Sequence, residues 1–364
     1  MTEPQSKREP RRHLTAEEMS RRQERKKSFK LSSLLTGEAW TNALRGFVPF
    51  FRVLGAALIQ GTRGVSRFAR SLGKAATWKR AGKNARATVK VFFSNRSATA
   101  GTIIMLFFVL LALFGRDVFP YNSITDETMK YLPPSAEHWL GTDNLGRDVF
   151  SQLVHGSRDV LTIAFLTSLV TIGLGTVIGM LSGLLGGWSD RVIQIITNLF
   201  LSIPSFPVLL ILASFFTIED PFSFAVVLSV WSWAGLGRAI RSQIISLKER
   251  DFIQACKVMN LSKSHILFQE LLPNISSYIL INFVMIMRSA ITGSVGIMML
   301  GLAAFQPSNW GAMLLRAKDA GALLIPEASY FLFAPIVAIL LFQMGAILLA
   351  NGLDETLNPR LRKN

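Results

Sequence analysis

Long apolar runs separated by polar segments constrain this chain more than any other feature of its sequence. Six of these runs are long enough to cross a bilayer, because a spanning helix needs about 20 residues. They cover approximately residues 97–115, 160–182, 191–217, 222–247, 275–303 and 328–352. Inside lipid, backbone polar groups must be satisfied within the chain, and helices achieve this. The sequence therefore predicts an all-α polytopic membrane protein with six transmembrane helices.

The composition agrees with a membrane protein. Half of the residues are hydrophobic, 17% are charged and the mean hydropathy is +0.38, which is unlike a soluble domain. The single cysteine, Cys256, excludes an intrachain disulfide. Without an apolar N-terminal segment followed by a cleavage site, we do not expect a secretory precursor.

Residues 1–96 form a basic arm with a separate character. Residues 1–100 hold 22 Lys and Arg against 6 Asp and Glu, whereas the rest of the chain is balanced. Between residues 40 and 91, basic residues alternate with aromatic and aliphatic ones, but no apolar run is long enough to span. This pattern favours amphipathic helices lying on an anionic leaflet, with membrane lipids as partners. A nucleic-acid-binding arm and a solvated tail are the alternatives; no recognisable nucleic-acid module supports the former.

The distribution of basic residues predicts the orientation. With the N-terminus inside, the inner segments carry 32 Lys and Arg and the outer segments carry six. Because basic residues favour the cytoplasmic side, we expect a multi-pass protein of the cytoplasmic membrane with both termini and the 248–274 loop in the cytoplasm.

The 248–274 loop is a polar segment between two spans. The spacing of its apolar residues predicts a short amphipathic helix over 249–259. Asn260 follows where a left-handed residue would end that helix, and Leu272-Pro273-Asn274 is expected to end a second short helix and open the next span. Such a loop either lies in the headgroups or docks on a cytoplasmic partner.

The spans contain three unusual features. Pro204 and Pro207 interrupt the third span, which predicts a kink beside a cavity. Gly175, Gly179 and Gly183 are four residues apart, a pattern that permits close helix packing within the chain or against a second subunit. Arg288 lies near the middle of the fifth span, where an ionisable group is costly and therefore a functional candidate; snorkelling or pairing with backbone carbonyls is the structural alternative.

Two further motifs flank the spans on the predicted outer side. Residues 141–148 read GTDNLGRD, where Thr142 or Asp143 is a candidate cap for a short helix. Residues 307–314 read PSNWGAML, and the chain closes with NGLDETLNPRLR at 351–362.

Together these motifs resemble a known family. Residues 254–260, QACKVMN, followed by Leu272-Pro273, resemble the EAA loop of permease subunits in ATP-binding-cassette importers, with Gln254 replacing the leading Glu and Asn260 the Gly. GTDNLGRD is similar to a signature of peptide-type permeases, and the other two motifs match the family's PSWGxML (with Asn309 inserted) and its closing segment. Residues 97–362 are thus identified as resembling the C-type permease of a dipeptide or oligopeptide importer.

This resemblance implies a type I importer permease fold and a division of labour. A second homologous permease would complete the pathway as a heterodimer, two cytoplasmic ATPase subunits would hold ATP and Mg²⁺, and an extracytoplasmic binding protein would deliver a peptide substrate. The chain itself has no Gly-x4-Gly-Lys-Ser/Thr phosphate cradle, no metal-ligand spacing and no nucleophile–base motif. We therefore expect a transport subunit without cofactor or enzymatic activity of its own.

The resemblance also implies site residues. The contacts with the ATPases would come from the loop residues Glu249, Asp251, Phe252, Gln254, Ala255, Cys256, Met259, Asn260 and Leu261. Candidate pathway residues are Arg288, Pro204 and Ser294, the last because many relatives carry a glutamate there. The external motif contributes Gly141, Thr142, Asp143, Gly146, Arg147 and Asp148.

Three alternatives remain open. The same class of importer carries oligosaccharides or nickel, and the motifs do not separate these substrates. A stand-alone secondary transporter would show paired ionisable residues in the spans and often an internal repeat, neither of which is present. A scaffold anchored by the arm would not need six spans.

Overall fold

The computed structural model describes residues 91–216, 218, 220–303 and 308–357. The interpretation of the basic arm therefore lies outside the described residues, apart from 91–96, and so do Pro307 and residues 358–362 of the closing motif. All of the described residues belong to one structural unit, which contains the spans and the loops that join them.

Five helices of the described part are long and apolar enough to cross a membrane. They are α4 (Arg96–Val118), α5 (Val149–Leu185), α8 (Pro221–Lys248), α11 (Leu272–Met298) and α13 (Ser329–Leu357). A bent pair, α6 (Gly187–Ser202) and α7 (Ser205–Phe215), gives a sixth candidate if its two halves count as one broken span. The described residues contain no β-strand, only an isolated bridge between Thr142 and Asp148. The predicted fold class, an all-α membrane protein, is confirmed.

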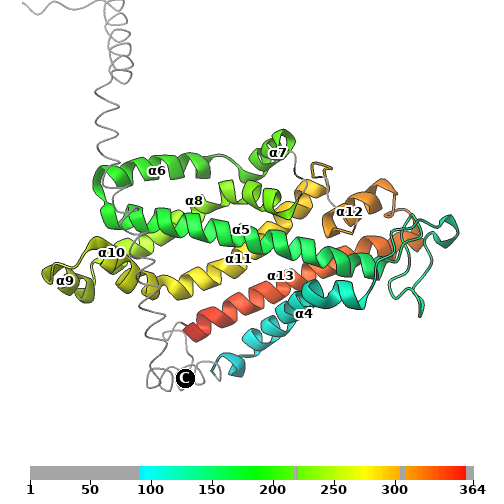
Figure 1. Cartoon of the computed structure of the whole chain (residues 1–364), viewed down its shortest axis with the longest axis horizontal. Helices are drawn as coiled ribbons and strands as arrows, with labels where there is room; N and C mark the ends of the chain where they lie inside the picture. The colour runs from blue at the N-terminus through cyan, green and yellow to red at the C-terminus, as the bar shows by residue number, and fades with distance from the viewer. Residues whose placement is uncertain (1–90, 217, 219, 304–307, 358–364) are drawn as a thin grey trace, which may run out of the picture. The chain divides into compact units, whose positions relative to one another are not determined.

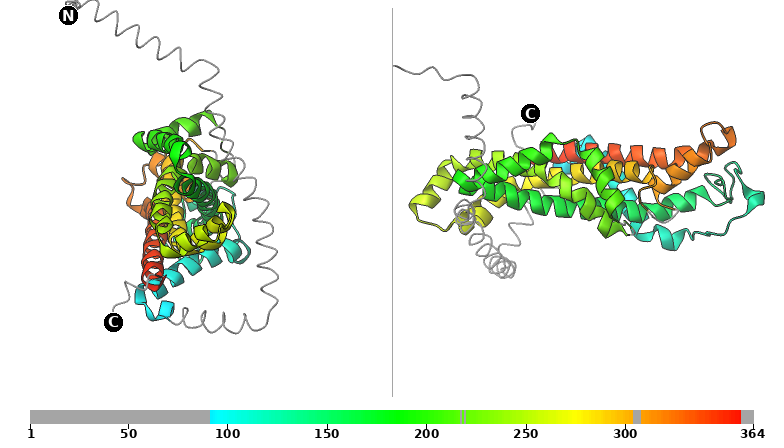
Figure 2. Two further views of the ribbon diagram at one scale, coloured as in Figure 1. Left: turned by 90° about the vertical axis from the view of Figure 1, so that its left-hand side faces the viewer. Right: turned by 90° about the horizontal axis from the view of Figure 1, so that it is seen from above.

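Short helices join the spans. They are η1 (Glu127–Met129), α9 (Asp251–Val258), α10 (Lys263–His265), the π-helical turn η2 (Ile266–Leu271), α12 (Trp310–Asp319) and η3 (Pro326–Ala328). In Figures 1 and 2, α9 and α10 lie at one end of the helix bundle, whereas α12 and the segment between α4 and α5 lie at the other end. The 248–274 loop and the GTDNLGRD segment are therefore at opposite ends of the bundle.

The glycine face of α5 packs within the chain. A Cβ on Gly175 would meet the Leu236 side chain at 2.9 Å, and one on Gly179 would meet the Gly237 carbonyl oxygen at 2.5 Å. A Cβ on Gly183 would meet Ile244 at 2.7 Å. The three glycines thus permit the close approach of α5 and α8, so this face serves packing within the chain.

Two local expectations were wrong. The helix after GTDNLGRD is not a short one capped by Thr142 or Asp143: it begins at Val149 and runs without a break into the second span, because Asp148 is the cap and accepts a hydrogen bond from Ser151 N at 2.6 Å. Leu272-Pro273-Asn274 opens the next span as expected, but no break ends a second helix before it. Pro273 lies in the first turn of α11, where its missing N–H is tolerated, and η2 leads directly into it.

Candidate functional site

The helix α9 has two faces of different character. Its inner face carries Ile253 and Cys256, which are 0% and 5% exposed. They pack with Ile266, Leu267 and Leu271 of the following segment in one apolar cluster that also contains residues of α5 and α8. Burial of this face holds the short helix against the ends of the spans, since an isolated eight-residue helix is not stable in water.

The outer face of α9 is apolar yet uncovered. Phe252 is 38% exposed, Met259 63% and Val258 87%, and Ala255 is exposed between them. Spacings of three and four residues place these side chains on one side of the helix. A short helix that is anchored on one side and presents an apolar strip on the other is typical of a segment that docks on another protein.

The polar loop residues flank this strip or support it. Glu249 is exposed at the end of α8, and Asp251 is exposed in the first turn of α9. Gln254 donates a hydrogen bond to the Lys248 carbonyl oxygen at 3.1 Å and accepts one from Lys257 Nζ at 3.2 Å. Gln254 therefore helps to fix the turn between α8 and α9.

Two of the nine predicted loop residues face inward. Cys256 is buried, and Leu261 is half-buried and packs against the same cluster. Cys256 lies on the inner face of the amphipathic helix, and Leu261 lies on the inner side of the turn that follows. The matching motif alone does not tell inward-facing from outward-facing residues. They hold the loop in place rather than contribute to its exposed surface.

Asn260 has the predicted left-handed conformation. Its φ is 53°, and the Leu261 N–H after it donates to the Cys256 carbonyl oxygen at 3.0 Å. This geometry ends α9 and turns the chain toward α10, a role for which Asn is second only to Gly.

At the other end of the bundle, GTDNLGRD folds around one buried carboxylate. Asp143 is 0% exposed and accepts hydrogen bonds from Arg147 Nε and Nη2 at 2.9 and 2.7 Å and from Gln152 Nε2 at 3.0 Å. Its other oxygen accepts from the Leu145 and Arg147 backbone N–H groups. An ion pair this buried needs such additional bonds to offset its desolvation.

The remaining residues of this motif have local roles. Gly141 and Gly146 have φ values of 70° and 75°, and a Cβ on Gly146 would collide with the Asp126 carbonyl oxygen. Thr142 Oγ1 accepts from the Leu132 N–H at 2.8 Å and donates to the Met129 carbonyl oxygen. The motif thus shapes the segment that precedes α5.

Two participants in this cluster were not predicted from the sequence. Gln152 Oε1 accepts a hydrogen bond from Arg316 Nη2 of α12 at 2.8 Å, and Arg316 Nη1 lies 4.0 Å from Asp143 Oδ2. Burial and the neighbouring Arg147 lower the pKa of Arg316 to about 10. Trp310 of the PSNWGAML motif is fully buried and donates to the Leu153 carbonyl oxygen at 2.9 Å. The GTDNLGRD and PSNWGAML motifs therefore meet, with α12 packed against the start of α5.

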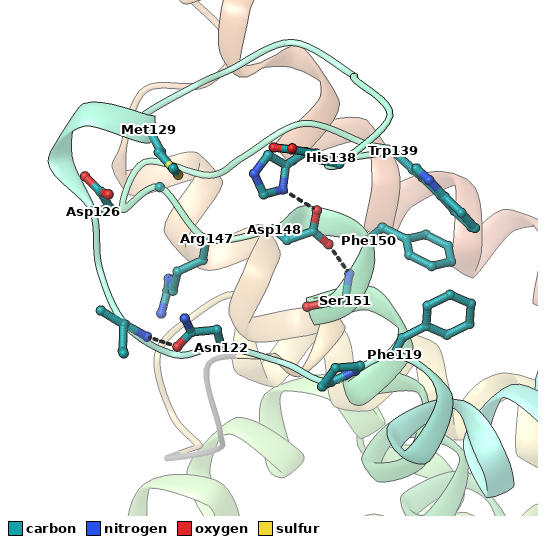
Figure 3. A pocket seen from close by; sticks show the side chains of 14 residues that line it. Phe119, Asn122, Asp126, Met129, His138, Trp139, Arg147, Asp148, Phe150 and Ser151 are labelled. Atoms are coloured by element: carbon teal, nitrogen blue, oxygen red, sulfur yellow. Dashed lines mark hydrogen bonds and ion pairs between the residues drawn. The ribbon is translucent and has the colours of Figure 1, made fainter.

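Beside this cluster, the segment between α4 and α5 lines an open pocket of about 560 Å³ (Figure 3). Phe119, Trp139 and Phe150 form an aromatic wall, with ring centroids 4.9–5.8 Å apart. Figure 3 shows His138 pointing to Asp148 across the pocket, and their Nδ1 and Oδ2 atoms are 2.9 Å apart. At the rim, hydrogen bonds from Thr128 lower the pKa of Asp126.

A hollow of about 520 Å³ lies where α6 and α7 break, at an angle of 88°. Pro204 lines it, together with residues of α5, α8 and α11. The expected kink at Pro204 is thus a sharp break in the helix beside a cavity, as irregular backbone at membrane depth requires.

The other two pathway candidates do not line this hollow. Ser294 is 1% exposed, and its hydroxyl donates to the Ile291 carbonyl oxygen at 2.9 Å. Arg288 is half-buried; its carbonyl oxygen accepts a bond from Gln343 Nε2 of α13 at 3.3 Å, and its Nε has no hydrogen-bond partner within the described part. A pathway role for Arg288 and Ser294 stays a prediction. Within the described residues no group of three or more His, Cys, Asp or Glu could hold a metal ion.

Comparison with known proteins adds the family. A family model described as binding-protein-dependent transport system inner membrane component matches residues 175–363. A second, the N-terminal TM domain of oligopeptide transport permease C, matches residues 85–134 and so begins before the expected boundary at residue 97.

Individual relatives cover most of the chain. The dipeptide transport system permease protein DppC of Alkalihalophilus pseudofirmus is 30% identical over 280 residues, which are 76% of this chain and 90% of that protein. The oligopeptide transport system permease protein OppC of Bacillus subtilis is 29% identical over 75% of this chain and 88% of its own length. The glutathione transport system permease protein GsiD of Pectobacterium atrosepticum is 30% identical over 74% and 89%.

Among solved structures, the MetNI methionine ABC transporter in inward-facing conformations matches 56% of this chain and 96% of its own, with 20% identity and a TM-score of 0.42. With more than half of its length matched by the family model and a relative 30% identical over most of both chains, this chain belongs to the family of binding-protein-dependent transport system inner membrane components.

Proposed function

We propose that this chain is one of two permease subunits of an ATP-driven peptide importer and that α9 couples it to cytoplasmic ATPases. The observation that carries the proposal is the two-faced α9, anchored by Ile253 and Cys256 and uncovered at Phe252, Ala255, Val258 and Met259. An exposed apolar strip marks a contact surface, and in this family we assign the contact to the ATPases.

The mechanism follows from how α9 is connected. It is joined to α8 by two residues and to α11 through α10 and η2, and its inner face packs in a cluster shared with α5 and α8. A displacement of α9 by ATPase subunits closing on ATP would therefore tilt α8 and α11 and change the access of the pathway between them. ATP and Mg²⁺ would bind to those partner subunits.

The remaining parts of the assembly come from the relatives. Permeases named for dipeptide, oligopeptide and glutathione transport support a peptide substrate, and the family description names a binding protein. A second homologous permease would complete the pathway. The excess of basic residues in the predicted inner segments supports a cytoplasmic position for α9, both termini and the arm.

An Ala255→Asp substitution tests the coupling site. The new carboxylate would lie in the centre of the apolar strip. Once the ATPases cover this strip, an unpaired buried charge there costs several kcal/mol. We expect the variant to insert and pair with its partner permease but to lose the ATPases on co-purification and to lose uptake.

Two controls accompany this variant. Lys257→Glu adds a carboxylate two positions away on the polar side of α9 and should keep the ATPases and uptake. Gln254→Glu gives up the hydrogen bond that Gln254 donates to the Lys248 carbonyl oxygen, but it retains the acceptor for Lys257 and restores the family's residue, so it should also keep both. Normal uptake with Ala255→Asp would refute α9 as the coupling site.

A further inference from the structure

Among the described residues, none of those that line the hollow at the α6–α7 break is charged. Hydroxyl groups come from Thr167, Ser205, Ser232 and Ser289. Aromatic surface comes from Phe206 and from the pair Phe200 and Trp231, whose ring centroids are 4.7 Å apart. A volume of about 520 Å³ lies within the range of sites that hold small molecules.

One of these hydroxyls lacks a partner. Thr167 is 1% exposed, yet its Oγ1 makes no hydrogen bond to any described residue. Buried Ser and Thr hydroxyls in helices commonly donate to the carbonyl four residues earlier, as Ser168 does at 2.8 Å to Ala164. Leaving a buried hydroxyl unpaired costs free energy. Thr167 lines the hollow, and a rotation of its side chain would bring this unpaired hydroxyl to a molecule there.

The backbone around the hollow is also open. Gly235 of α8 lines it, and a Cβ built there would meet nothing within 4 Å. Thr167 and Gly235 lie near the middle of α5 and α8 respectively, which places the hollow about halfway across the bundle.

We propose that this hollow is a transit subsite for the backbone and apolar side chains of a peptide, a proposal that rests on the peptide-importer function above. Hydroxyls both donate and accept, so they match the alternating N–H and C=O groups of any peptide, whatever its sequence. The aromatic pair contacts apolar side chains. With no lining charge, the subsite would neither select nor retain a peptide by the charge of its side chains.

Narrowing the hollow at Gly235 tests this assignment. The test uses the whole importer, with its second permease, ATPases and binding protein, in proteoliposomes, and it measures uptake of radiolabelled tri-alanine and tri-phenylalanine. Gly235→Ala should lower tri-phenylalanine uptake about tenfold more than tri-alanine uptake, since a single methyl group in a filled apolar site discriminates on that scale. Gly235→Leu should abolish uptake of both peptides.

Matched variants separate this effect from structural damage. Gly173 of α5 is another helical glycine with nothing within 4 Å of a Cβ, and it does not line the hollow; Gly173→Leu should leave the selectivity unchanged. Thr167→Val should reduce uptake of both peptides. Thr171→Val, which removes a second buried and unpaired hydroxyl outside the lining, should not.

Unchanged uptake and selectivity in the Gly235 variants would overturn the subsite while leaving the importer function intact. Loss of the second permease from both Gly235 variants would overturn it too, since the hollow would then be a subunit contact. A wild-type complex that imports neither peptide would instead refute the peptide-importer function and the subsite with it.

Discussion

Single residues at the α9 end of the chain show how closely backbone geometry follows from side-chain chemistry. Asn260 was expected to end the helix in a left-handed conformation, and its φ of 53° confirms this. The local signal was sufficient because few residue types tolerate this region. Neither Cys256 nor Leu261 could be assigned a direction so directly, because their burial depends on η2 and the span ends that pack against them.

Asn260 offers a test of this turn. Asn260→Ala should favour opening of the turn by about 1 kcal/mol, the cost of a left-handed conformation for a residue with a Cβ and no local polar group. Asn260→Gly should be neutral or slightly stabilising at this position. Hydrogen–deuterium exchange of the amides of 251–258 in the purified complex would measure this, with faster exchange in the alanine variant only. Equal exchange in both variants would show that the turn does not hold α9.

At the scale of elements, α5 and α8 form the central pair of the bundle. Spacing alone identified Gly175, Gly179 and Gly183 as a packing face, but not its partner. The structure shows that partner to be α8 of the same chain, through Leu236, Gly237, Ile240 and Ile244. Small residues matter here because helices in lipid associate through close packing rather than through the hydrophobic effect.

Substitution on this face should separate the packing role from other effects. Gly179→Leu would bring a Cβ to 2.5 Å from the Gly237 carbonyl oxygen, and such overpacking against backbone costs about 1–3 kcal/mol. We expect a lower melting temperature of the solubilised complex and less protein in the membrane. Gly173→Leu, where a Cβ meets nothing within 4 Å, is the matched control and should melt as the wild type does. Similar melting of both variants would contradict the assigned interface.

The sequence predicted elements better than it predicted their junctions. Hydrophobic runs located the spans because period and length are strong signals, and Pro204 marked the break between α6 and α7. The start of α5 was misplaced because Thr142, Asp143 and Asp148 are all competent caps, and only tertiary contacts decide among them. The cluster of Asp143, Gln152 and Arg316 was beyond prediction for the same reason: Gln152 and Arg316 are 164 residues apart, and no local pattern links them.

At the scale of the whole described bundle, the two motif-bearing segments lie at opposite ends (Figures 1 and 2). One end carries α9 with its uncovered apolar strip, and the other carries the Asp143 cluster and the aromatic pocket. Since five helices between these ends are long and apolar enough to cross a membrane, a membrane around them would separate the two ends. The proposed transport by alternating access needs this arrangement, because the proposed ATPase contact and the proposed substrate-delivery side would face different compartments.

This separation can be measured by labelling from one side of the membrane. Cys256, the single cysteine, is 5% exposed, and Cys256→Ala removes any labelling of this residue. In the Cys256→Ala protein, Ala136→Cys and Leu324→Cys place exposed thiols at the α12 end, and Lys263→Cys places one at the α9 end. If basic residues set the orientation, a membrane-impermeant maleimide should label Ala136→Cys and Leu324→Cys in intact spheroplasts, and Lys263→Cys only after permeabilisation. The reverse pattern would show that the chain has the opposite orientation in the membrane, and it would exclude cytoplasmic ATPases as partners of α9. Labelling of all three variants from outside would mean that the loops do not lie on opposite sides, and alternating access through this bundle would then lose its structural basis.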